Sequence, residues 1–192
     1  MKEISKAILT RIGLCLLLVP LMSAGMSPAV KAKAALSQAE VLAKRWQTDA
    51  ALVAILSPDV DVNGVSGAHY AASWVYTFVS PKKPDKAFMI SVNTAAGASA
   101  ASKMPPDKSY LFYVGTSFGL TGSEQVSAVV QPGSQALPDQ FLDSDKAIAA
   151  AKVAGYRPVA PVNMSLSRGA GKPAVWRIGE FEIDAVSGKA VK

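Results

Sequence analysis

The C-terminal stretch KPAVWRIGEFEIDAVSGKAVK, residues 172–192, carries the clearest indication of the fold class. Residues 174–178 are rich in strand-forming side chains, and residues 181–184 alternate apolar and acidic side chains, the period of a half-buried strand. Asp184 and Gly188 then predict a turn. An aspartate carboxylate accepts hydrogen bonds from amides two or three residues on, and glycine adopts positive φ without a Cβ clash. The stretch therefore predicts two antiparallel strands closed by a structural turn.

The same pattern occurs 91 residues earlier, where residues 89–97 align with residues 180–188 without a gap. The turn positions that correspond are Asn93 with Asp184 and Gly97 with Gly188. A strand containing tryptophan precedes each copy, and a helical pattern lies upstream of each. We interpret the chain as an α+β protein with two diverged repeats, each a helix packed on an antiparallel sheet. Chance similarity between two hairpins is the alternative.

Residues 1–34 have the pattern of a secretory signal peptide. Three basic residues precede an apolar run of 11 residues, 12–22, whereas a helix that crosses a bilayer needs about 20. The triplet Ala32-Lys33-Ala34 is a small-x-small site that predicts cleavage before Ala35. A second site of this kind is Ser27-Pro28-Ala29.

Removal of residues 1–34 changes the charge balance of the chain. It takes away five of the 20 basic and one of the 14 acidic residues, so that 158 of the 192 residues remain with a net charge of +2. The remainder contains no cysteine and no basic cluster with interleaved aromatic residues. We therefore expect a periplasmic or secreted bacterial protein with no nucleic-acid partner and no stable membrane insertion after signal cleavage.

The remainder divides into residues 35–135, a first repeat with extra strands, and residues 136–192, the second repeat. A helix is expected from Ser37, with Glu40 completing a capping box, to about Leu56, where Ser57-Pro58 follows. A second helix is expected to begin at Asp143 or Ser144 and to run to about Ala154. Further strands are expected over residues 70–79, 109–114, 124–130 and 159–167.

The best polar cluster is formed by Asp59, Asp61 and Asn63, whose D-x-D-x-N-G spacing copies the first half of a calcium loop. The twelfth position of such a loop supplies a bidentate carboxylate, and here it is Tyr70. A polar turn is the alternative to this weak metal site. We expect no tight calcium binding, no other metal and no cofactor.

Two short motifs resemble catalytic signatures. Residues 115–119 match G-x-S-x-G, but the only histidine, His69, precedes the serine, whereas the hydrolase motif requires a later one. Residues 80–83 match S-x-x-K among prolines, which predict a loop instead of the helix that this chemistry needs. We therefore expect no catalytic residues and no enzymatic activity.

Residues 144–151, SDKAIAAA, and residues 183–191, IDAVSGKAV, resemble the PepSY domain family. That family shows a helix with a kAi..A pattern and a final strand that ends in vDa.tGkv. The resemblance covers residues 143–192, and residues 36–97 are similar as a more diverged copy, with Asn93 in place of the family's aspartate. The resemblance implies a helix over an antiparallel sheet. It also implies export, since the family occurs in exported bacterial proteins and protease propeptides, and a role in restraining peptidases.

Two function classes remain. The first is an exported, non-enzymatic PepSY-like module that binds an exported protein partner, with peptidase regulation as the role that the resemblance implies. The alternative is a periplasmic protein that binds a small ligand or a metal. A deep polar pocket lined by both repeats would favour the ligand-binding alternative, and its absence would favour the protein-binding module.

Overall fold

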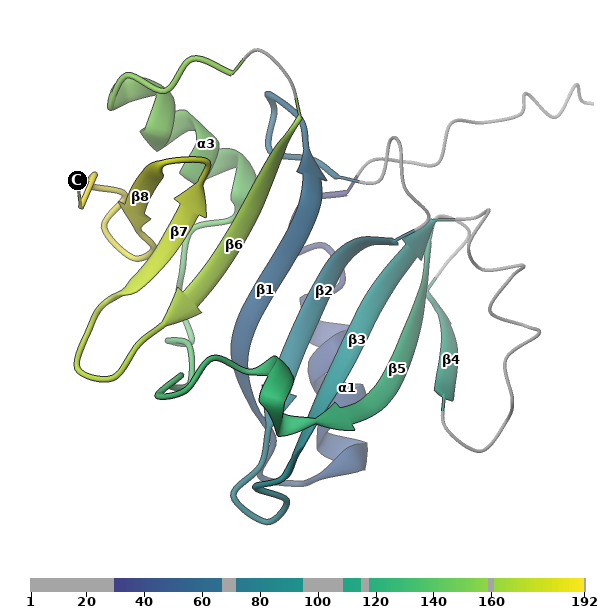
Figure 1. Ribbon diagram of the computed structural model, residues 1–192. Helices are drawn as coiled ribbons and strands as arrows, with labels where there is room; N and C mark the ends of the chain where they lie inside the picture. Colours follow the sequence, from purple (N-terminus) through teal and green to yellow (C-terminus); the bar gives the residue numbers. More distant parts are fainter. Residues whose placement is uncertain (1–29, 67–71, 95–108, 115–117, 159–160, 192) are drawn as a thin grey trace, which may run out of the picture.

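The computed structural model describes residues 30–66, 72–94, 109–114, 118–158 and 161–191 (Figure 1). These residues form an α+β fold of two α-helices, one short 3-10 helix and eight strands. The helices are α1 (Leu36–Trp46), η1 (Ser127–Val129) and α3 (Ser144–Val153). The strands are β1 (Ala51–Val60), β2 (Ala72–Val79), β3 (Lys86–Thr94), β4 (Ser109–Val114), β5 (Phe118–Val126), β6 (Val162–Arg168), β7 (Ala174–Ile178) and β8 (Phe181–Asp184).

All eight strands belong to one antiparallel sheet with the order β4-β5-β3-β2-β1-β6-β7-β8. Within the sheet, β1 pairs with β6, and Ile55 lies opposite Leu166. The strands that follow α1 and the strands that follow α3 therefore form one continuous sheet. At the β8 edge, the chain end covers the strand, because Val191 donates its backbone N–H to the Glu182 carbonyl at 2.8 Å. Covering an edge in this way blocks pairing with other strands.

The core is a single cluster that contains side chains from both helices and from the strands between them. Both helices therefore cover the same face of the sheet. Trp74 of β2 and Trp176 of β7 are fully buried and meet edge to face, with ring centroids 6.2 Å apart. Burying a large aromatic side chain stabilises a fold by roughly 1.5–3 kcal/mol. These two side chains anchor the centre of the core.

The first helix is shorter than the sequence predicted. Helix α1 ends at Trp46, and the expected continuation to Leu56 is wrong, because strand β1 begins at Ala51. A short apolar run such as residues 50–56 has no periodicity that separates a buried helix from a buried strand. The predicted capping box is also wrong, since the Ser37 hydroxyl donates to the neighbouring Gln38 side chain and makes no cap.

Proline 58 lies within β1, although the sequence predicted that it would follow a helix. The pairing of β1 with β6 shifts its register between Ser57 and Val60, and Pro58 falls inside this irregularity. A proline has no N–H to donate, so within a sheet it is tolerated where the ladder is interrupted. The register shift thus explains how a proline occupies a central strand.

The second helix is confirmed. Asp143 caps α3 by accepting a hydrogen bond from the Ser144 amide at 2.8 Å, and Gly155, with φ of 104°, follows the helix. The strand expected over residues 124–130 is wrong in its bounds, because β5 runs from Phe118 to Val126 and η1 follows it. Glycines obscured this strand in the sequence. Gly122 is required there, since a Cβ on it would lie 2.6 Å from the Phe88 ring.

Candidate functional site

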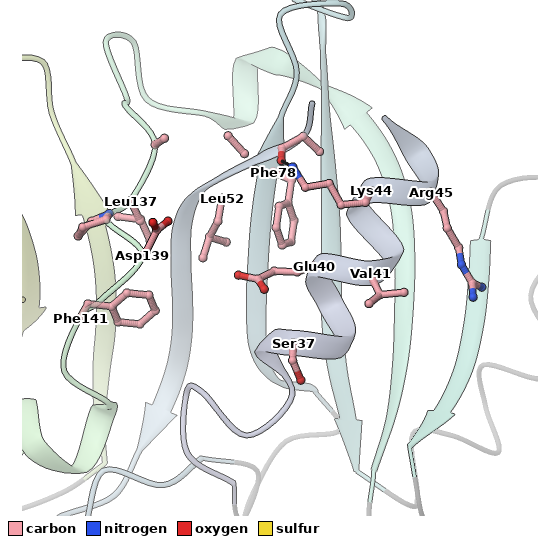
Figure 2. Close-up of a pocket in the computed structure, with 14 residues that line it drawn as sticks. Ser37, Glu40, Val41, Lys44, Arg45, Leu52, Phe78, Leu137, Asp139 and Phe141 are labelled. Atoms are coloured by element: carbon pink, nitrogen blue, oxygen red, sulfur yellow. Dashed lines mark hydrogen bonds between the residues drawn. The ribbon is translucent and has the colours of Figure 1, made fainter. Parts of the chain in front are cut away.

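A cleft of about 670 Å³ lies between α1 and residues 136–141 (Figure 2). Leu52 of β1 and Phe78 of β2 form its floor, and Leu137 and Phe141 line the wall opposite α1. The cleft is partly open to solvent and is not an enclosed cavity. Its lining therefore combines elements that are about 90 residues apart in the chain.

The wall opposite α1 is held in place by hydrogen bonds and ring contacts. The Leu137 amide donates to the Leu52 carbonyl at 2.8 Å, which fixes the segment against β1. The Phe141 ring meets Trp176 edge to face, with centroids 6.5 Å apart. Lys33 lies over the same ring, with Nζ 4.5 Å from its centroid, and also donates to the Phe141 carbonyl at 3.0 Å. The cleft is therefore a preformed feature of the packed fold.

Carboxylates flank the apolar floor on both sides. Glu40 on α1 and Asp139 on the opposite segment are exposed, and Figure 2 shows them on opposite sides of the Leu52 side chain. Lys44 also lines the cleft, but its ammonium group donates to the Ala50 carbonyl at 2.7 Å. Figure 2 shows Arg45 directed away from Glu40. An apolar floor between two carboxylates suits a lysine or arginine side chain, whose aliphatic stem contacts apolar surface while its charged end faces the acids.

The predicted calcium-like loop is a polar turn in the structure. Asp61 Oδ1 accepts hydrogen bonds from the amides of Asn63 at 2.7 Å and Val65 at 3.1 Å, while Oδ2 accepts from the Asn63 side chain at 3.3 Å. Asp59 is buried, with 6% of its surface exposed. Within the described parts of the chain, no three His, Cys, Asp or Glu side chains gather in a way that could hold a metal. Tyr70 lies outside the described residues.

This turn, residues 61–65, packs against the N-terminus of α3. Gly64 has φ of 76°, and its carbonyl accepts a hydrogen bond from the Ser144 hydroxyl at 2.6 Å. Lys152 donates to the Val62 carbonyl at 2.7 Å. The D-x-D-x-N-G motif thus joins the first half of the chain to the second helix, a role that its spacing alone did not indicate.

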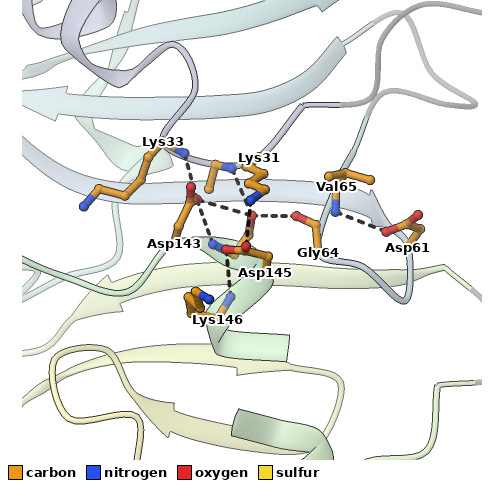
Figure 3. Close-up of polar contacts among 10 residues, drawn as sticks. Lys31, Lys33, Asp61, Gly64, Val65, Asp143, Asp145 and Lys146 are labelled. Carbon is orange, nitrogen blue, oxygen red and sulfur yellow. Dashed lines mark hydrogen bonds and ion pairs between the residues drawn. The ribbon is translucent and has the colours of Figure 1, made fainter. Parts of the chain in front are cut away.

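Charged groups surround the same helix N-terminus (Figure 3). Lys31 and Asp145 form an ion pair with Nζ and Oδ2 2.7 Å apart. The hydrogen bond to Asp145 raises the pKa of Lys31. Burial, the largest single effect on Asp145, opposes ionisation, but the hydrogen bonds from Lys31 and the Lys146 amide prevail and lower its pKa. Because solvent screens an exposed pair of this kind, it contributes little to stability.

Asp184 and Gly188 supply the hydrogen bonds and the positive φ that a turn at the C-terminal end of β8 requires. Asp184 Oδ1 accepts hydrogen bonds from the Ser187 amide at 2.7 Å, the Ser187 hydroxyl at 2.9 Å and the Val186 amide at 3.1 Å. Gly188 has φ of 71°, and its amide donates to the Asp184 carbonyl at 2.9 Å. In the earlier copy, Asn93 lies in β3 opposite Gly119 of β5. Gly97 lies outside the described residues.

Asp184→Ala should lower the free energy of unfolding by about 0.5–2 kcal/mol, as for other side chains that cap backbone amides. The hydrogen bond from the Ser187 amide is the main cause of the lowered pKa of Asp184. A carboxyl whose pKa is lowered by folding stabilises the protein above its unfolded-state pKa, near 4, and this contribution is lost as the pH falls through its folded-state pKa. The difference between wild type and variant should therefore shrink in acid.

Urea unfolding at pH 7 and at about pH 3 measures this difference. Asp85→Ala is the matched control, since Asp85 is an exposed aspartate in the turn between β2 and β3. Equal unfolding midpoints for wild type and Asp184→Ala at pH 7 would show that Asp184 does not stabilise the turn.

The structure does not bring the S-x-x-K pair together as a catalytic unit. The Ser80 hydroxyl donates to Asp49 Oδ1 at 2.6 Å, and this bond lowers the pKa of Asp49. Lys83 instead pairs with Glu124 Oε2 at 2.8 Å and lies over the Trp46 ring, with Nζ 5.5 Å from its centroid. The G-x-S-x-G serine and His69 lie outside the described residues.

Comparison with known proteins gives no match: no family model, no curated protein and no solved structure matches the chain. None of the helices in the described residues is long and apolar enough to cross a membrane.

Proposed function

We propose that the chain is an exported, non-enzymatic PepSY-like module that binds a protein partner through the cleft between α1 and residues 136–141. The observation that carries this proposal is the composition of the cleft, an apolar floor of Leu52 and Phe78 with exposed carboxylates on both sides. Because the cleft is partly open to solvent, it suits a side chain presented by another protein. Small ligands, by contrast, are usually buried over most of their surface.

The order of elements supports two PepSY-like repeats. Helix α1 is followed by β1, β2 and β3, and helix α3 is followed by β6, β7 and β8. In the sheet, β1 and β6 are neighbours; β2 and then β3 follow β1 on one side, and β7 and then β8 follow β6 on the other. This arrangement is the one expected when two copies of a helix and three strands share one sheet.

Equivalent tryptophan hydrogen bonds also support the two repeats. Trp74 Nε1 donates to the Val30 carbonyl at 2.8 Å, and Trp176 Nε1 donates to the Leu142 carbonyl at 2.9 Å. Each acceptor lies in the segment that precedes the helix of its own half of the chain. In each half, therefore, the tryptophan of the middle strand is hydrogen-bonded to the segment that precedes the helix.

The chemistry of the cleft defines the kind of partner. Glu40 and Asp139 favour a segment with a lysine or arginine beside an apolar residue, because the charged end meets the carboxylates while apolar groups contact Leu52 and Phe78. The resemblance of residues 143–192 to the PepSY domain adds a peptidase as the class of exported partner. Restraint of that peptidase is the role we propose.

Photocrosslinking from two helical valines tests the proposal. Val41, on the rim of the cleft, and Val153, at the end of α3, are each replaced by photoreactive benzoylphenylalanine in the full chain, which is irradiated in an exporting bacterium. Val153 is 92% exposed and Val41 54% exposed, so random collisions would favour the control position. We expect a specific protein adduct from position 41 and none from position 153. Equal labelling from both positions would contradict binding through the cleft.

A further inference from the structure

Residues 30–35 are an integral part of the folded protein. Val30, Ala32 and Ala35 are buried, with 8%, 0% and 0% of their surfaces exposed. Val30 exchanges two backbone hydrogen bonds with Ser66, at 2.8 and 3.0 Å. This segment, which we call the N-terminal strap (residues 30–35), therefore packs as core, although a signal peptide that ends at residue 34 would remove most of it.

The strap accepts hydrogen bonds from two buried side chains of β2. Trp74 Nε1 donates to the Val30 carbonyl, and the Tyr76 hydroxyl donates to the Ala32 carbonyl, both at 2.8 Å. Both side chains have 0% of their surface exposed. Burial strongly raises the pKa of Tyr76, so its hydroxyl stays protonated and needs an acceptor. Loss of the strap would leave both donors without these acceptors.

On its other side, the strap contacts the N-terminus of α3 (Figure 3). The Ala32 amide donates to the Ser144 hydroxyl and the Lys33 amide donates to Asp143 Oδ1, both at 3.0 Å. Ser144 in turn donates to the Gly64 carbonyl at 2.6 Å. The strap therefore bridges β2 and α3, which belong to opposite halves of the chain.

From these contacts we infer that signal processing cuts the Ala29–Val30 bond, so that the mature chain begins with Val30. The inference rests on the export that we proposed above. Residues 27–29, Ser-Pro-Ala, have the small residues at the first and third positions before the cut that a signal peptidase requires. A cut before Ala35 would remove five residues of the strap.

The reaction is hydrolysis of one peptide bond. Water adds across the amide, Ala29 leaves with the signal peptide as a carboxylate, and the Val30 nitrogen becomes an amine. That amine still carries hydrogens, so it retains a donor for the Ser66 carbonyl, 2.8 Å away. This cut therefore preserves every hydrogen bond described for the strap.

N-terminal sequencing and intact mass of the exported protein, produced from the full chain in an exporting bacterium, test the inference. We expect loss of residues 1–29 and an N-terminus at Val30. An N-terminus at Ala35 would overturn the inference but leave the binding function open to its own crosslinking test. A full-length chain held in the inner membrane would overturn both the cut and the export.

Two alanine variants provide a matched comparison. Signal peptidases require a small residue immediately before the cut, so Ala29→Gln should block processing and accumulate the precursor. Ala34→Gln, at the other small-x-small site, should be processed like wild type, because Ala34 is exposed and tolerates a longer side chain. Blocked processing in Ala34→Gln together with normal processing in Ala29→Gln would overturn the inference.

Discussion

Gly64→Ala should lower the free energy of unfolding by more than about 3 kcal/mol. A Cβ on Gly64 would lie 2.5 Å from the Asp145 nitrogen and Cα and 2.7 Å from the Ser144 carbonyl carbon. All three are backbone atoms, so no side-chain rotation relieves the overlap. The backbone of Gly64 also has φ of 76°, a region that other residues adopt at a further cost. The overlap could be relieved only if the turn moved away from α3.

Gly133→Ala is the control for this prediction. Gly133 has the same φ of 76°, but a Cβ there would meet only the Ala170 Cβ, at 3.8 Å. The control should therefore lose about 1–2 kcal/mol, the cost of the left-handed conformation alone. Urea unfolding of both variants separates backbone strain from the clash with α3. Equal losses in the two variants would show that the contact between the turn and α3 does not contribute to stability.

Deletion of residues 30–34 should also lower the free energy of unfolding strongly. The joined sequence keeps residues 1–29 in front of Ala35. We expect the free energy of unfolding to fall by more than about 4 kcal/mol. Each buried donor left without an acceptor costs about 1–3 kcal/mol, and the apolar contacts of Val30 are lost as well. The donors are those of Trp74 and Tyr76. Thermal unfolding followed by circular dichroism should show a much lower melting temperature or no cooperative transition.

Lys31→Ala is the control within the same segment. It removes the exposed ion pair with Asp145 but leaves every backbone group of the strap in place. The melting temperature of Lys31→Ala should therefore stay close to that of wild type. A deletion variant that melts like wild type would contradict the role of the strap and, with it, the structural reason for processing before Val30.

Local signals in the sequence predicted the C-terminal part of the fold well. Helix α3 has its cap at Asp143 and its glycine at Gly155, and β7 and β8 occupy the two strand patterns that precede the Asp184 turn. Each of these features depends on residues within a few positions of one another. A local pattern is sufficient where the chain satisfies its hydrogen bonds locally.

The incorrect predictions concern elements whose secondary structure depends on tertiary packing. Residues 51–56 form a strand because β2 and β6 supply hydrogen bonds on both sides, and the apolar run itself does not distinguish strand from helix. Strand β5 was misplaced because Gly119 and Gly122 weaken its pattern, yet Gly122 makes room for Phe88. Neighbours that are distant in sequence therefore determine both elements.

The cleft had no local signal in the sequence. Glu40 and Asp139 are about 100 residues apart, and each is an ordinary exposed acid within its own segment. Long-range contacts, among them the hydrogen bond from the Leu137 amide to the Leu52 carbonyl and the contact of Phe141 with Trp176, bring the two walls to opposite sides of one floor. The sequence pattern likewise favoured the later small-x-small triplet, whereas the packing of residues 30–35 favours the earlier one.

Charge reversal in the cleft, read by crosslinking from position 41, tests the proposed function most directly. Glu40→Lys with Asp139→Lys reverses both carboxylates that flank the floor, while Asp85→Lys with Glu180→Lys makes the same change in charge at exposed turns outside the cleft. We expect the first pair to abolish the adduct from position 41 and the second pair to preserve it. An adduct that survives reversal of Glu40 and Asp139, or that both pairs weaken equally, would contradict binding of a basic segment in the cleft.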